Sequence, residues 1–220
     1  IATTPERVWG MHPALESIRQ QTEKPDAIYI SIIEGAQLPD FLLVAPDILI
    51  LRHPAFHSED GQHDLGPVHK LLDCASEEDD PLTAILTFDD DILLAPFVAA
   101  SLVRAAVAWP DAAVGLSGWN AGGLLTREPA AFAPLDFVGQ HVPLHQLPAA
   151  VDILEGYAGV LYRRHFLELD LLAELSTGPA EVRYTDDVWI SGQLARWGVQ
   201  RLVVPLDSAT HTHTHTASPN

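Results

Sequence analysis

The most informative stretch of the chain is "LTAILTFDDD", which runs from Leu82 to Asp91. Its first seven residues are mostly apolar or β-branched, a composition typical of a buried strand. Three consecutive aspartates follow at once, and their like charges repel one another. Ligands of open α/β sheets collect at the carboxyl ends of the strands. The pattern therefore predicts a strand that ends in an acidic, ligand-binding turn.

The rest of the chain alternates between strand-like and helix-like segments. Strands are predicted at 27–33, 47–51, 82–88, 112–118 and 200–205, with a strand–turn–strand unit at 152–164, and helices at 13–21, 66–75, 96–108 and 186–198. The segment 119–150 is rich in Gly, Pro and Ala, and we expect a long loop region there, with a short helix or hairpin within it as the alternative. Loops of this length are often functional. This alternation predicts an α/β fold in one domain over residues 1–220, with a tail at 206–220.

Composition narrows the classes of partner. The chain has 220 residues and a formal net charge of −18, so we expect no nucleic-acid ligand, which requires a basic surface. No run of about 18 apolar residues occurs, so no membrane span is expected within the chain. The sequence opens abruptly on Ile1, which is compatible with a domain cut from a longer chain, and the compartment stays unknown.

The aspartate triplet is a candidate metal site. In an extended chain Asp89 and Asp91 point to one side and Asp90 to the other. Two carboxylates on one side suit Mg²⁺ or Mn²⁺, and the apolar residues around them favour burial, which requires a cation. Lysines are rare, with only Lys24 and Lys70, so a divalent metal would also supplement the charge available to a phosphate ligand. The alternative is a solvated acidic turn.

Together with the acidic strand end, four stretches carry a resemblance to a known family. They are "TTPER" (Thr3–Arg7), "DLGPVHKLL" (Asp64–Leu72), "LEGYAGVLYRR" (Leu154–Arg164) and "TDDVWISGQLARWG" (Thr185–Gly198). In this order they resemble GT-A-fold, metal-dependent glycosyltransferases, and among these the small domains of bacteria, algae and large algal viruses. The resemblance implies a Rossmann-like mixed central sheet flanked by helices. It also implies transfer of a sugar from a nucleotide-sugar donor, with UDP as the favoured carrier, to an acceptor hydroxyl.

The resemblance also assigns roles to individual residues. Those implied to bind the nucleotide or donor are Thr3, Thr4, Pro5, Arg7, Asp64, Lys70, Asp89, Asp90, Trp119, Asn120, Glu155 and Gly156. Asp91, with Asp89, would bind Mn²⁺ or Mg²⁺, and His211 or His213 from the tail would complete the metal shell. Each role has a plainer alternative: Arg7 as a solvated turn residue, Lys70 on a helix surface, Trp119 in the core, and the histidines in a polar tail.

The resemblance implies that a late aspartate is the catalytic base of an inverting reaction. Asp187 is the first choice and Asp186 the second, because both open the helix predicted at 186–198. The positive end of a helix favours an ionised carboxylate. The alternative is that the two aspartates only cap the helix.

Two other functions remain open. One is a metal-dependent nucleotidyltransferase, although "TTPER" lacks the glycine-rich phosphate loop usual in that class. The other is a non-catalytic module that binds a sugar or nucleotide. The donor sugar, the acceptor and the oligomeric state cannot be predicted from the sequence.

Overall fold

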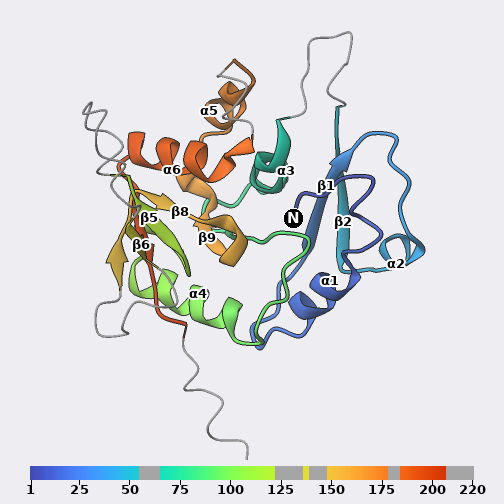
Figure 1. Cartoon of the computed structure of the whole chain (residues 1–220), viewed down its shortest axis with the longest axis horizontal. Helices are drawn as coiled ribbons and strands as arrows, with labels where there is room; N and C mark the ends of the chain where they lie inside the picture. Colours follow the sequence, from blue (N-terminus) through green and yellow to red (C-terminus); the bar gives the residue numbers. More distant parts are fainter. Residues whose placement is uncertain (55–64, 122–135, 139–147, 178–183, 207–220) are drawn as a thin grey trace, which may run out of the picture.

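The computed structural model describes residues 1–54, 65–121, 136–138, 148–177 and 184–206. It is a mixed α/β structure, in which helices flank strands on two sides (Figure 1). In these residues no helix is long and apolar enough to cross a membrane. The predicted α/β class is therefore confirmed.

The largest sheet has five strands in the order β3-β9-β4-β10-β7. Their bounds are β3 Ala84–Thr87, β9 Val160–Arg163, β4 Ala112–Gly115, β10 Gln200–Val203 and β7 Ala149–Ala150. Strand β9 runs antiparallel to both β3 and β4, whereas β10 runs parallel to β4 and antiparallel to β7. The sheet is mixed, as expected.

Two smaller sheets accompany it. Strands β1 (Ile28–Ile33) and β2 (Ile48–His53) form a parallel pair, in which Ile28 faces Ile48. Strand β5 (Gly118–Asn120) lies between β6 (Asp136–Val138) and β8 (Ile153–Leu154), antiparallel to both. The expected central sheet is thus divided into three separate sheets.

The helices cover the strands on opposite sides (Figure 1). On one side, α1 (His12–Arg19) and α4 (Val98–Ala108) bury Leu15 and Leu102 in one core cluster. On the other, α3 (His69–Glu77), α5 (Leu169–Ala173) and α6 (Asp186–Arg196) bury apolar side chains in a second cluster. The described residues also form α2 (Asp40–Leu43) and the 3-10 turns η1 (Gly66–Val68), η3 (Gly156–Ala158), η4 (Arg164–Phe166) and η5 (Glu174–Thr177).

The predicted elements agree with the structure within a few residues, with three corrections. The helix expected from Pro96 begins at Val98, because residues 96 and 97 form a turn. The helix expected at 66–75 begins as the 3-10 turn η1. The long loop expected at 119–150 contains strands β5, β6 and β7 in its described parts, and the antiparallel pairing of β5 with β6 agrees with the hairpin alternative. Strands of two or three residues are too short to produce a period-2 pattern.

The pairing of β9 with β3 and with β4 brings three chain segments together at one end of the main sheet. Val160, the first residue of β9, lies opposite Thr87 on one side and Gly115 on the other. The carboxyl ends of β3 and β4 therefore meet the turn that leads into β9. Gly159 in that turn has φ of +100°, and a Cβ there would lie 2.6 Å from the Phe88 ring, so glycine is required.

Candidate functional site

Asp90 ties the acidic turn to the amino-terminal segment. It is buried, and its Oδ2 accepts a hydrogen bond from Thr3 Oγ1 at 2.6 Å. The Arg7 guanidinium donates to its Oδ1 and also pairs with Asp91 Oδ2 at 3.0 Å. Thr3 and Arg7, both predicted to bind the donor, therefore position the triplet in this structure. Asp91 keeps an exposed side chain, with two thirds of its surface open to solvent.

Lys70 lies between two of the predicted site segments. Its side chain is 5% exposed, and Nζ is 3.0 Å from Asp89 Oδ1 and 3.0 Å from Asp186 Oδ2. Burial by itself lowers the pKa of Lys70, but Asp186 and Asp89 outweigh it and hold the pKa above its ordinary value. The alternative of a surface lysine is therefore wrong, since the ammonium is a buried positive charge that links α3, the acidic turn and α6.

The contact with Asp186 is a close ion pair. Asp186 Oδ2 is buried, and Lys70 Nζ lies 3.0 Å from it. A buried carboxylate needs a partner of opposite charge, so Lys70 offsets the cost of burying Asp186.

Asp187 faces the same space from the first turn of α6. Its Oδ1 accepts a hydrogen bond from the Gly156 N–H at 2.9 Å. Burial, and next the Asp186 carboxylate, raise the pKa of Asp187 to about 6. Thr185 is the N-cap residue of α6 and makes no side-chain capping bond. The two aspartates therefore come after the N-cap position of α6. One carboxylate oxygen of Asp187 accepts a hydrogen bond from the Gly156 N–H of another element, η3. Both facts disfavour helix capping as the role of the two aspartates.

Gly156 lies against the charged ends of two side chains of the site. A Cβ at this position would lie 2.8 Å from Lys70 Nζ and 2.9 Å from Asp187 Oδ1. Both distances are shorter than real Cβ contacts allow. The absence of a side chain at position 156 therefore permits the approach of the lysine and the aspartate.

The other predicted donor-binding residues have structural partners. Glu155 accepts a hydrogen bond from Ser117 Oγ at 2.5 Å. The Asn120 side-chain oxygen accepts from the Asp152 N–H at 3.1 Å, and Trp119 is half-buried in β5. Thr4 and Pro5 lie in the turn before α1, where the Thr4 carbonyl accepts from the Arg7 and Val8 N–H groups. Asp64, His211 and His213 lie outside the described residues.

The residues at this site suit a divalent metal only in part. Asp89 and Asp91 offer hard oxygen ligands, and both side chains are at least a third exposed. Two carboxylates are an incomplete shell, but Mg²⁺ and Mn²⁺ sites commonly take their remaining ligands from substrate phosphates and water. One oxygen of each carboxylate is already in an ion pair, Asp89 with Lys70 and Asp91 with Arg7, and the metal role of the two aspartates stays a prediction.

A second polar cluster was missed from the sequence. Ligand-type atoms of His53, His69 and Asp73 lie within 4.8 Å of one another. His69 Nε2 accepts from the Leu65 N–H at 3.1 Å, and His69 Nδ1 bonds Asp73 Oδ1 at 2.8 Å. Both nitrogens of His69 are already used, and Asp73 also accepts a hydrogen bond from Ser31 Oγ of β1. The His53 ring of β2 stacks on the His69 ring at a centroid distance of 3.7 Å, so the cluster ties α3 to the β1–β2 pair. The spacing of four between residues 69 and 73 was the available signal.

A scan of the chain against protein-family models finds no match. A search of curated proteins likewise returns no significant relative. The case for a function therefore rests on the site's own chemistry and on the motifs in the sequence.

Proposed function

We propose that this chain is a GT-A-type glycosyltransferase that moves a sugar from a nucleoside-diphosphate sugar, with UDP as the favoured carrier, to an acceptor hydroxyl. The observation that supports it best is the arrangement around Asp187. A carboxylate whose pKa is raised to about 6 lies next to a second aspartate and a buried lysine, at the edge where the acidic turn leaves β3. Strongly perturbed carboxylates of this kind are concentrated at catalytic sites.

The chemistry follows from these positions. Asp187 takes the proton of the acceptor hydroxyl, and the acceptor oxygen attacks the anomeric carbon of the donor sugar. The bond from that carbon to the diphosphate oxygen breaks, and the nucleoside diphosphate leaves with the electron pair. Direct attack inverts the configuration at the anomeric carbon. A pKa of about 6 leaves Asp187 ionised at pH 7 yet basic enough to accept a proton.

Asp89 and Asp91 would hold the divalent metal, which supplies Lewis-acid stabilisation of the departing diphosphate. Arg7 adds a positive charge beside Asp91, and half of its side chain is exposed. The remaining cation, Lys70, is committed to Asp89 and Asp186. The scarcity of other lysines in a chain of charge −18 is consistent with the need for a metal.

The test is calorimetric titration of UDP, GDP and UDP-glucose, each in Mn²⁺ and in EDTA. We expect UDP to bind in Mn²⁺ and to lose at least about tenfold in affinity in EDTA. Asp91→Ala should cause a similar loss. Asp111→Ala, which removes an exposed aspartate before β4, is the matched control and should bind as the parent does.

Binding that is equally strong in EDTA, or undiminished in Asp91→Ala, would refute the metal role. Catalysis is tested separately by hydrolysis of the donors with Asp187→Asn. Metal-dependent binding with hydrolysis unchanged in that variant would instead identify a module that binds nucleotide without using Asp187.

A further inference from the structure

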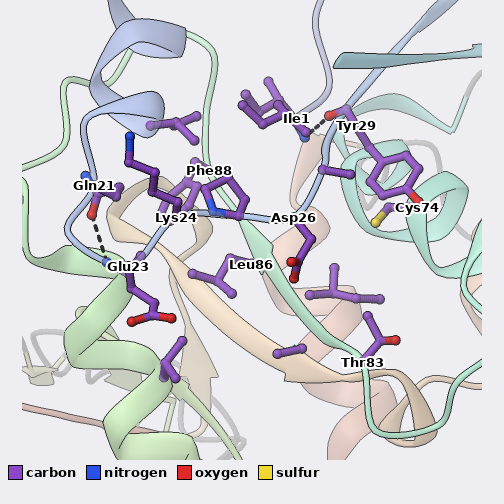
Figure 2. Close-up of a pocket in the computed structure, with 18 of the residues that line it drawn as sticks. Ile1, Gln21, Glu23, Lys24, Asp26, Tyr29, Cys74, Thr83, Leu86 and Phe88 are labelled. Atoms are coloured by element: carbon purple, nitrogen blue, oxygen red, sulfur yellow. Dashed lines mark hydrogen bonds between the residues drawn. The ribbon is translucent and has the colours of Figure 1, made fainter. Parts of the chain in front are cut away.

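The cavity beside β1 and β3 is not the place where an acceptor meets Asp187. This cavity has a volume of about 350 Å³, and Figure 2 shows Tyr29 and Leu86 among the side chains that line it. Its lining includes Lys70 but neither Asp186 nor Asp187. A molecule in this cavity would therefore not offer a hydroxyl to the proposed base. Asp187 is only partly buried where α6 meets η3, so an acceptor reaches it from the solvent side.

Exposed apolar side chains gather around the contact between η3 and α6. Tyr157 is 46% exposed and directly follows Gly156, whose N–H donates to Asp187. Tyr184 and Val188 are also exposed, and they come just before and just after the two aspartates at the start of α6. Single exposed apolar side chains are common, but a group of them beside a candidate catalytic carboxylate indicates a ligand.

The Tyr157 ring is held at both of its ends. At the backbone end, Gly159 N–H donates to the Gly156 carbonyl at 3.1 Å and closes the η3 turn. At the other end, the phenol O–H donates to Ser117 Oγ at 3.4 Å, and Ser117 Oγ donates to Glu155 at 2.5 Å. The ring is thus fixed in one orientation with about half of its surface open. A binding group that is already ordered costs little entropy when a ligand arrives.

The polar groups around this ring are carboxylates. Glu155 is linked to Tyr157 through Ser117, and Asp187 bonds the residue before Tyr157. The nearby ammonium of Lys70 is 5% exposed and already paired with two aspartates. Carboxylates accept hydrogen bonds from hydroxyls, whereas they repel an anionic ligand. The surroundings therefore suit a ligand that is rich in hydroxyls.

A sugar ring matches this combination of groups. One face of a hexose ring carries mainly C–H groups, and its rim carries hydroxyls. The C–H face can pack on a flat aromatic ring and remove apolar surface from water, while the hydroxyls donate to neighbouring carboxylates. A lipid chain would instead need a continuous apolar surface, whereas Tyr157 has a polar partner at each end.

We propose that the acceptor is a carbohydrate, whose ring stacks on Tyr157 and presents one hydroxyl to Asp187. The acceptor role rests on the proposed function and names the substrate class of its second substrate. The sugar lies on the side of η3 and α6, whereas the donor is expected at the acidic turn that follows β3. Because Gly156 joins Tyr157 to Asp187 through one hydrogen bond, the stacking ring and the base keep a fixed spacing.

The test is saturation-transfer NMR, which detects a sugar that binds the chain and needs no knowledge of the donor sugar. The probes are cellobiose, lactose, maltose and N,N′-diacetylchitobiose, each with UDP and Mn²⁺ and again without them. We expect at least one to bind, and irradiation of the aromatic protons of the chain alone should saturate the C–H protons of its stacked face. This part of the test uses the parent chain and no variant.

Variants then assign the binding to the Tyr157 ring. Tyr157→Ala should weaken sugar binding roughly tenfold, because it removes the stacking surface. Tyr157→Phe keeps the ring and should stay within about threefold of the parent. Trp197→Ala removes a similarly exposed aromatic side chain at the other end of α6, and this matched control should bind as the parent does.

The outcomes separate this assignment from the proposed function. UDP binding in Mn²⁺ without binding of any probe sugar would overturn the carbohydrate assignment and leave the transferase standing, as would sugar binding undiminished in Tyr157→Ala. Sugar binding that depends on Tyr157 in a chain that binds no nucleotide would overturn the acceptor role and the transferase together, and would leave a sugar-binding module. Binding of the peptide acetyl-Gly-Ser-Gly-Thr-Gly-amide in place of the sugars, lost in Tyr157→Ala, would overturn the carbohydrate class in favour of a protein acceptor.

Discussion

The raised pKa of Asp187 makes a prediction that needs no knowledge of the substrate. Asp187→Asn keeps an oxygen that can accept the Gly156 N–H but removes the ionisation. The pKa of Asp187 is about 6 in the folded chain against an ordinary 3.8. At 1.36 kcal/mol per pH unit, this difference corresponds to about 3 kcal/mol against the ionised form in the folded state.

The direction of the effect follows from proton binding. Between about pH 4 and pH 6 the folded chain holds a proton on Asp187 that the unfolded chain has released, so rising pH favours unfolding. The stabilisation by this group is complete below pH 4 and is lost as pH rises through 6. The parent should therefore lose up to about 3 kcal/mol between pH 4 and pH 7.5 relative to Asp187→Asn.

The assay is urea unfolding of both chains at half-unit steps from pH 4 to pH 7.5, with the free energies of unfolding compared at each pH. Other groups titrate in both chains, so only the difference between the two curves is interpreted. Parallel curves would refute the reasoning, because they would mean that Asp187 has the same pKa in both states. If the parent instead lost free energy of unfolding relative to Asp187→Asn as the pH falls, the pKa of Asp187 would be lowered in the folded chain.

Two further predictions concern the packing around this group. Lys70→Met should lower the free energy of unfolding by about 3–5 kcal/mol, because it leaves the buried Asp186 carboxylate without its cation. Lys24→Met, at an exposed residue, should change it by less than about 0.5 kcal/mol. Similar losses in both variants would contradict a buried ion pair between Lys70 and Asp186. Gly156→Ala should lower the free energy of unfolding by about 1–3 kcal/mol, because its Cβ would overlap Lys70 Nζ. Gly192→Ala within α6 is the control: its Cβ would meet nothing within 4 Å, so it should raise the free energy of unfolding by about 0.5–1 kcal/mol. Urea unfolding measures each, and a neutral Gly156→Ala would show that the site can move aside.

The sequence by itself determined the α/β class and the long elements. Ile28–Ile33 and Ala84–Thr87 are recognisable because their residues are β-branched or apolar and their neighbours are turn formers. The α6 helix is recognisable from its first-turn aspartates and the glycine after it. The sequence also placed Asp89–Asp91 at a strand end, because the apolar, β-branched run stops at Phe88.

Only the tertiary structure decided which site residues meet. Lys70, Asp89 and Asp186 are far apart in the chain, and their contacts depend on how α3, β3 and α6 pack, which no local pattern encodes. The same holds for Asp90, whose side chain turns to Thr3 and Arg7 rather than to solvent. The cavity beside β1 and β3 was also invisible in the sequence, because its lining residues come from segments that are far apart in the chain. Short-range propensity fixes elements, whereas burial and charge pairing across the fold fix the site.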